Sequence, residues 1–192
     1  AWGSYEVLGS TLDDAVGEAF DKVAKALGLG YPGGPVISKY AKDGKRDAID
    51  FPRAMMHSGD LKFSLSGLKT AVVTYIHRQQ EAGMEINLPD LAASFEASVV
   101  DVLVAKSITA CKQTGAKVLC IGGGVAANPM LREELKLKLE RKHIRVVMPD
   151  LSDCSDNASM IASVALDLYR DGEYGSLSDD PVAHLPLRGN SQ

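Results

Sequence analysis

The residues best suited to contact a ligand are three consecutive glycines, Gly122, Gly123 and Gly124, which follow a short apolar segment. A strand that ends in glycines and opens a helix brings backbone N–H groups against a ligand without side-chain obstruction. Nucleotide phosphates and ribose are the usual ligands of such turns. No Gly-Lys-Ser/Thr sequence follows, so the segment is neither a P-loop nor a dinucleotide-binding fingerprint. A tight turn that needs small residues for packing explains the pattern equally well, and both interpretations stay open.

Carboxylates at two other places could also act on a ligand. Asp21 follows the core-facing Phe20 in an amphipathic helix pattern, where a solvated surface role is the simplest interpretation. Asp150, Asp153 and Asp156 lie close together in the sequence, and their oxygens suit a hard or borderline cation. Three carboxylates without a histidine are not a metal signature. For Asp156, near the start of the last predicted helix, helix capping is the stronger interpretation.

Other reactive side chains give weaker signals. Ser64, Ser66 and Lys69 could form a Ser/Lys nucleophile pair, but a polar strand edge that leads into a helix is the favoured interpretation. The four histidines have no HxxxH or HExxH spacing and the three cysteines form no CxxC pair, so a structural zinc site is not indicated. One predicted helix is rich in basic residues, which we interpret chiefly as its solvated face, with nucleic-acid contact as the minority alternative. These residues are Arg132, Lys136, Lys138, Arg141 and Lys142.

The second half of the chain alternates strand and helix patterns around the glycines. Strand–helix–strand alternation predicts an α/β layered fold. The predicted elements are a strand at 117–121, a helix at 131–142, a strand at 144–148 and a helix at 155–170.

The first half is predicted to be mostly helical. A helix should start at Ser10 or Thr11, with Asp13 and Asp14 in its first turn, and stop at Gly28. Gly34 belongs to a rigid turn, where its simplest role is turn chemistry. The remaining elements are a strand-like start at 5–8, a short helix at 36–41, a loop at 42–60, a strand at 63–66, a helix at 68–80, and a helix capped by Asn87 that ends before Gly115.

Composition limits the class of protein. The chain has 192 residues, of which 45% are hydrophobic and 24% charged, and this balance excludes a disordered tail or a disulfide scaffold. No apolar run is long enough to cross a membrane. The three cysteines are expected to be reduced thiols in a cytoplasmic protein. A net charge of −4 argues against non-specific binding to nucleic acid, but it does not exclude a local basic patch.

Six segments, taken together and in this order, resemble the TsaD/Gcp family over nearly all of residues 4–170. That family is the catalytic subunit for N6-threonylcarbamoylation of tRNA adenosine, formerly labelled O-sialoglycoprotein endopeptidase. The segments are TLDDAVGEAFDK (11–22), YPGGP (31–35), FSLSGLKT (63–70), LAASF (91–95), GGVAAN (123–128) and SDNASMIA (155–162).

The resemblance implies an α/β fold of the actin-like ATPase type, with two RNase H-type lobes around a nucleotide cleft. Residues 1–172 would form the C-terminal part of that architecture, with a helical insertion, and residues 173–192 an irregular tail. The implied reaction transfers threonylcarbamoyl from ATP-derived threonylcarbamoyl-adenylate to N6 of the adenosine beside the anticodon, in tRNAs that read codons beginning with A. The implied partners are tRNA and subunits of the TsaB and TsaE types, in the cytoplasm.

The resemblance also assigns roles to single residues, although it leaves the catalytic residues unknown. Asp21, Gly34 and Asn128 would contact the adenylate or nucleotide, together with Gly123 and Gly124 of the turn. Asp156 would be the carboxylate ligand of a bound iron or zinc ion, which would polarise the carbamoyl group as a Lewis acid.

One departure from the family pattern qualifies the expected activity. The family's HxxxH motif, which supplies two further metal ligands, and its Ser-Gly-Gly-His-Thr loop are both absent from the sequence. We therefore expect a C-terminal portion that is inactive alone, binds metal weakly and self-associates through uncovered apolar surface. The alternative is a non-catalytic nucleotide-binding or subunit-pairing module. A literal endopeptidase ranks last, because no HExxH motif or Ser/His/Asp arrangement is present.

Overall fold

The computed structural model describes residues 5–181 and contains six α-helices, two short strands and two 3₁₀ turns within that range. Sequence interpretations that fall on residues 1–4 and 182–192, including the end of the predicted tail, lie outside the described residues. The elements are α1 (Val16–Ala26), α2 (Gly33–Ala41), α3 (Ser66–Glu81), α4 (Leu88–Thr114), β1 (Val118–Cys120), η1 (Gly124–Ala127), α5 (Pro129–Glu140), β2 (Arg145–Val147), η2 (Leu151–Asp153) and α6 (Ala158–Arg170).

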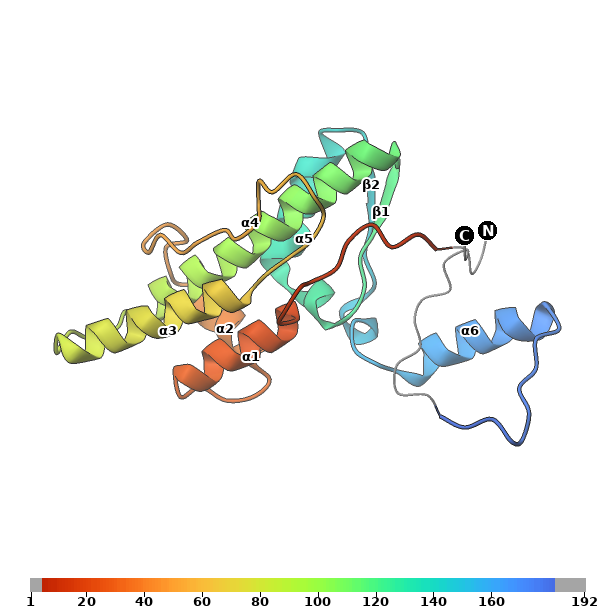
Figure 1. Cartoon of the computed structure of the whole chain (residues 1–192), viewed down its shortest axis with the longest axis horizontal. Helices are drawn as coiled ribbons and strands as arrows, with labels where there is room; N and C mark the ends of the chain where they lie inside the picture. The colour runs from red at the N-terminus through yellow and green to blue at the C-terminus, as the bar shows by residue number, and fades with distance from the viewer. Residues whose placement is uncertain (1–4, 182–192) are drawn as a thin grey trace.

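The long helix α4 contributes residues to both hydrophobic cores of the molecule. Its 27 residues extend over roughly 40 Å, with α1, α2 and α3 beside its first half and α5 and the two strands beside its second half (Figure 1). The Asn87 side chain accepts a hydrogen bond from the Asp90 backbone N–H at 3.0 Å, and Gly115 ends the helix with a left-handed φ of 68°. Both predicted boundaries of this helix are therefore confirmed.

Two hydrophobic cores lie along α4. In the first, Phe95 meets Phe20 of α1 edge to face, with ring centroids 4.9 Å apart. In the second, a stripe of Leu131, Leu135 and Leu139 on α5 packs with Val104. Every residue from 91 to 100 is buried, so this stretch of α4 has no face exposed to solvent.

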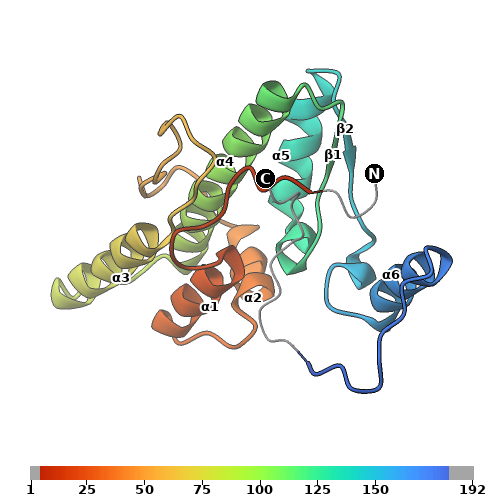
Figure 2. The ribbon, with the colours of Figure 1, turned by 45° about the vertical axis from the view of Figure 1, so that its right-hand side comes forward.

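The sheet consists of β1 and β2, which run parallel with Leu119 opposite Val146. The helix α5 connects them, as expected because parallel strands need a crossover. Figure 2 shows α5 between α4 and this strand pair. The predicted α/β class is thus present in the second half of the chain, while the first half is mostly helical and includes a strand-like bridge between Thr11 and Phe63.

The start of α1 differs from the prediction. The helix begins at Val16 rather than at Ser10 or Thr11, so Asp13 and Asp14 do not lie in its first turn. The Asp13 carboxylate instead accepts hydrogen bonds from the backbone N–H groups of Leu65 and Ser66, at 2.8 and 3.3 Å, at the start of α3. The predicted strand at 63–66 is correspondingly reduced to one bridge, because these residues form the capped entry to α3.

The last helix also starts later than predicted. α6 begins at Ala158, and its N-cap is Asn157, whose side chain accepts from the Met160 backbone N–H at 3.0 Å. Asp156 is not the cap, which corrects the favoured interpretation of that residue. No residue of α6 is buried, and its exposed apolar side chains include Met160, Ile161 and Tyr169. Among the described residues, no helix is both long and apolar enough to cross a membrane.

Substitution of Asp13 by alanine tests the capping of α3. Hydrogen bonds from the Ser64 and Ser66 hydroxyls, with backbone donors, hold the pKa of the Asp13 carboxyl far below its ordinary value. We expect Asp13→Ala to lower the free energy of unfolding at pH 7 by about 1–2 kcal/mol. Because the pKa is depressed in the folded state, this contribution is complete above the unfolded-state pKa, near 4, and is lost as the pH falls below it.

Urea unfolding at pH 7 and at steps down to pH 3 measures this difference. Asp47→Ala is the matched control, because Asp47 is exposed and makes no hydrogen bond or salt bridge with other described residues. A gap between wild type and Asp13→Ala that stays constant across this pH range would contradict the assignment.

Candidate functional site

The three glycines form an open turn between β1 and α5. Gly123 has a φ of 78°, a conformation that side-chain-bearing residues rarely adopt, and Gly124 opens the 3₁₀ turn η1. A Cβ atom added at Gly122 or Gly124 would meet nothing within 4 Å. Internal packing therefore does not require glycine at these two positions. The bare, exposed backbone meets the condition for close approach of a ligand.

The turn is tied to the rest of the molecule by the Asn128 side chain. Its Oδ1 accepts from the Leu131 backbone N–H at 2.8 Å and so caps α5. Its Nδ2 donates to Glu96 Oε1 at 2.6 Å and to Ser38 Oγ at 3.1 Å. The Ser38 hydroxyl also donates to Glu96 Oε1. Asn128 thus uses its oxygen and its amide group inside the protein, and it positions the glycine turn against α2 and α4.

Ser38 and Glu96 were not among the residues predicted from the sequence. Glu96 lies in α4 with only 3% of its surface exposed, and Ser38 lies in α2, 58 residues earlier. The one available signal was the position of Glu96 in the segment LAASFEASVV, where a carboxylate interrupts a run of small and apolar residues. A buried carboxylate needs hydrogen-bond donors, so such a position indicates an internal polar partner.

Asp21 lies where α1 meets the start of α2. Its Oδ1 accepts from the Gly33 backbone N–H at 2.7 Å, and its Oδ2 takes part in no hydrogen bond within the described part of the chain. A Cβ at Gly33 would lie 2.5 Å from the Phe20 carbonyl oxygen, so the two helices can meet this closely only with glycine there. A Cβ at Gly34 would meet nothing within 4 Å, which leaves this position open.

The helix α2 therefore brings most of the predicted site residues together. Asp21 bonds to its first residue, Gly34 is its second residue, and Ser38, about 7 Å further along the axis, bonds to Asn128. The turn η1 also contacts α1 directly. Asp21, Gly34 and the turn that contains Gly123 and Gly124 are thus arranged around one short helix, although more than 90 residues separate the two ends of this set in the sequence.

Asp156 is the predicted site residue that stands apart. It is exposed and lies just before α6, which is separated from α1 and α2 in Figures 1 and 2. Among residues 5–181, no group of three or more His, Cys, Asp or Glu side chains is arranged to hold a metal ion. The cluster considered for Asp150, Asp153 and Asp156 is therefore not formed, and Asp156 alone does not make a metal site.

The considered Ser/Lys pair is not formed either. The Ser64 and Ser66 hydroxyls both donate to Asp13 Oδ2 at 2.6 Å. Lys69 instead lies 3.4 Å from Asp14 Oδ2.

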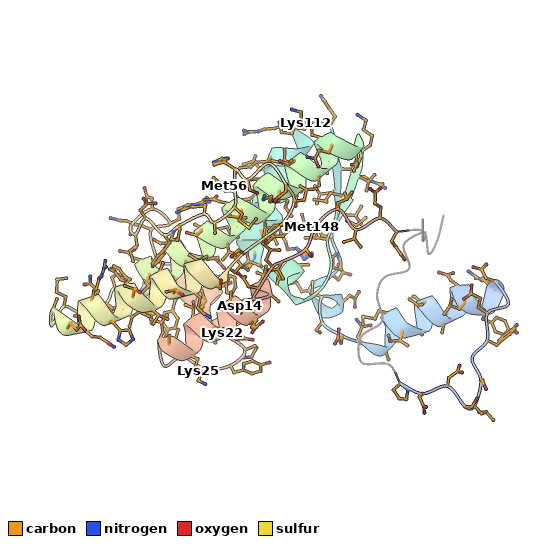
Figure 3. The ribbon with its side chains drawn as sticks, in the orientation of Figure 1. Asp14, Lys22, Lys25, Met56, Lys112 and Met148 are labelled. Atoms are coloured by element: carbon orange, nitrogen blue, oxygen red, sulfur yellow. The ribbon has the colours of Figure 1, made fainter. Side chains whose placement is uncertain are left out.

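The ion pairs around Asp14 join α1 to α3. The Lys22 ammonium lies 2.7 Å from Asp14 Oδ1, and Figure 3 shows the two side chains side by side. Hydrogen bonds from Lys22, with a further contribution from Lys69, lower the pKa of the Asp14 carboxyl, and the same pairing raises the pKa of Lys22. These charges hold the two helices together, and we assign them no catalytic role.

Comparison with known proteins agrees with the family resemblance. The model of the family described as TsaD, tRNA N6-adenosine threonylcarbamoyltransferase, matches residues 1–163. Proteins named tRNA N6-adenosine threonylcarbamoyltransferase from Clostridium botulinum (strain 657) and Clostridium perfringens (strain SM101) are each 50% identical to this chain over 186 residues. The match covers 97% of this chain and 55% of each relative, so the chain spans about half the length of the curated relatives it matches.

Two substitutions of Asn128 separate capping from donation to Glu96. Asn128→Ala removes both, and we expect it to lower the free energy of unfolding by about 2–3 kcal/mol, as the sum of a lost cap and a buried carboxylate with fewer donors. Asn128→Asp keeps a good capping oxygen but places a second carboxylate beside Glu96. We expect it to be at least as destabilised as Asn128→Ala.

Urea unfolding of the two variants and the wild type at pH 7 measures both effects. If Asn128→Asp is as stable as the wild type, Asn128 acts only as a cap and the network with Glu96 contributes nothing.

Proposed function

The chain belongs to the TsaD family, and from this membership we propose that it is part of an enzyme that transfers threonylcarbamoyl to N6 of a tRNA adenosine. The observation that carries the proposal is the 50% identity to named threonylcarbamoyltransferases over 97% of this chain. In its finer form, the donor is threonylcarbamoyl-adenylate and the acceptor is the adenosine beside the anticodon in tRNAs that read codons beginning with A.

In this proposal the adenylate binds where α1, α2 and the glycine turn meet. The exposed backbone from Gly122 to Gly124 receives the nucleotide, because no side chain obstructs it. The Asp21 Oδ2 atom, which makes no hydrogen bond within the described residues, accepts from a ligand hydroxyl such as that of ribose. Gly34 leaves room for the ligand beside α2, and Asn128 holds the turn in place through Glu96 and Ser38.

The metal implied by the family does not fit a complete site on the described residues. Asp156 offers one exposed carboxylate, and no set of three metal-binding side chains is formed between residues 5 and 181. We propose that an iron or zinc ion, where bound, takes its remaining ligands from another part of the complete protein. No step of the proposed function is derived through the metal.

The finer fold and the assembly belong to the same proposal. The unit of β1, the glycine turn, α5 and β2 fits the nucleotide-binding half of an actin-like ATPase lobe, with the helices of the first half as an insertion. Cytoplasmic tRNA and subunits of the TsaB and TsaE types are the proposed partners. The exposed apolar side chains of α6 support its packing against another surface, in the complete protein or in a second copy of this chain.

A second candidate function is a non-catalytic module that binds nucleotide or pairs with a subunit. One observation favours it: Asp156 has no metal-binding neighbours among the described residues. The endopeptidase interpretation is the least supported, since Ser64 and Ser66 bond to Asp13.

A transfer assay separates the two functions. We expect the complete gene product, supplied with threonylcarbamoyl-adenylate labelled in the threonyl group and the proposed partner subunits, to place label on tRNA that reads codons beginning with A. The control is a tRNA whose anticodon reads codons beginning with G. Nucleotide binding without label transfer to either tRNA would favour the non-catalytic module.

A substitution at Gly124 tests the ligand position independently of the fold. Because a Cβ at Gly124 meets nothing within 4 Å, we expect Gly124→Val to leave the unfolding midpoint nearly unchanged. The new side chain fills the space above the turn, so the affinity for ATP or the adenylate should fall roughly tenfold or more, in proportion to the lost close contact. Calorimetric titration measures this affinity. Unchanged binding by a folded variant would place the nucleotide elsewhere.

A further inference from the structure

A hollow of about 260 Å³ lies at the end of the molecule where α4 and α5 stop. Three lysines line it from three different segments. Lys112 comes from the last turn of α4, Lys117 precedes β1, and Lys142 follows α5. All three side chains are exposed at the rim, and the buried residues Cys111 and Ile144 lie at its base.

The surroundings of the hollow are strongly basic. Arg141 is next to Lys142, and the Arg145 backbone N–H donates to the Lys117 carbonyl oxygen at 2.9 Å. Residues 108–120 and 141–149 contain no Asp or Glu. None of the five basic side chains, which are Lys112, Lys117, Arg141, Lys142 and Arg145, takes part in a salt bridge within residues 5–181. Five positive charges are thus gathered around this hollow, in a protein whose net charge is −4.

Helix dipoles explain only part of this charge. Lys112 and Lys142 lie near the C-terminal ends of α4 and α5, where cations are favourable. Each helix end carries a partial charge of roughly −0.5, so two ends offset about one of the five positive charges. Lys117 and Arg145 lie beside the start of a strand, where no such dipole acts. Glu140, which directly precedes Arg141, offsets about one more, so an unneutralised charge of about +3 remains.

We propose that this lysine hollow, defined by Lys112, Lys117 and Lys142, binds phosphates of the tRNA backbone. This inference rests on the proposed function, which supplies a polyanionic RNA substrate. The volume of the lysine hollow lies below the roughly 300–1,000 Å³ of sites that enclose a small molecule, which argues against a free nucleotide as the occupant. Lysine ammonium groups on three sides of an open hollow suit successive phosphates and read no sequence.

The position of the lysine hollow agrees with this role. The helix α5 has Asn128 of the glycine turn at its start and Lys142 just after its end, and its 12 residues separate them by about 18 Å. That length corresponds to several base-pair steps along an A-form RNA stem. An RNA whose reacting base lies beside the adenylate bound at the glycine turn can therefore place phosphates of the adjoining stem on the lysines.

The test measures tRNA binding by the complete gene product over a range of salt concentrations. We expect the triple variant Lys112→Gln, Lys117→Gln, Lys142→Gln to bind tRNA roughly ten- to hundredfold more weakly at 0.1 M salt, with the slope of log K against log salt reduced by about two to three. The matched control is Lys25→Gln, Lys42→Gln, Lys62→Gln, which removes the same charge from exposed lysines. In Figure 3, Lys112 lies at the top of the view and Lys25 near the bottom, well apart from each other.

Each outcome decides the proposal. A loss of affinity confined to the first variant supports it. An equal loss in both variants, no loss in either, or no tRNA binding by the wild type overturns it. A first variant that keeps tRNA binding but loses binding to polyglutamate overturns it in favour of an acidic protein partner. If the wild type binds tRNA through these lysines but transfers no threonylcarbamoyl in the presence of its partner subunits, the proposed function fails and the lysine hollow stands.

Discussion

The buried carboxylate of Glu96 is the constraint on which the arrangement of the candidate site depends. A carboxylate with 3% of its surface exposed is stable only where donors replace water, and here these are the Ser38 hydroxyl and the Asn128 amide. The three groups come from α4, α2 and the turn before α5. Satisfying one buried charge therefore fixes the glycine turn to both halves of the molecule, and any ligand held by the turn is held relative to α2.

Hydrogen bonds to a carboxylate also stabilise the starts of α2 and α3. Asp13 accepts hydrogen bonds from backbone N–H groups at the start of α3, and Asp21 of α1 accepts one from Gly33 of α2, so each carboxylate caps a helix to which it does not belong. The unpaired N–H groups of a helix N-terminus attract a negative charge from any source. The starts of α2 and α3 are therefore positioned by polar contacts as well as by the packing of their apolar faces. Gly33, which has no Cβ, permits the close approach of α1 and α2.

Local signals in the sequence were enough for the long helices. Asn87 and Pro89 mark the start of α4 and Gly115 marks its end, because helix capping and helix termination depend on residues within one turn. The start of α1 was misplaced because the partners of Asp13 lie more than 50 residues away, and a capping aspartate looks the same whichever helix it caps. Ser38 and Glu96 were missed for the same reason. Asp21, Gly34 and Asn128 were selected by resemblance, and their ligand contacts stay a prediction.

The helix α5 sets the spacing between the two surfaces to which we assign a ligand. Leu131, Leu135 and Leu139 are buried along it against α4, so it can neither slide nor rotate without exposing that stripe. Asn128 caps its first turn, and Lys142, just after its last turn, lines the lysine hollow. A packed helix of fixed rise between an open glycine turn and a basic end keeps both surfaces at one separation. The proposed function, which brings a single base of a large, stiff RNA to a nucleotide site, needs such a fixed distance, because misplacement of the reacting atoms by an ångström lowers the reaction rate.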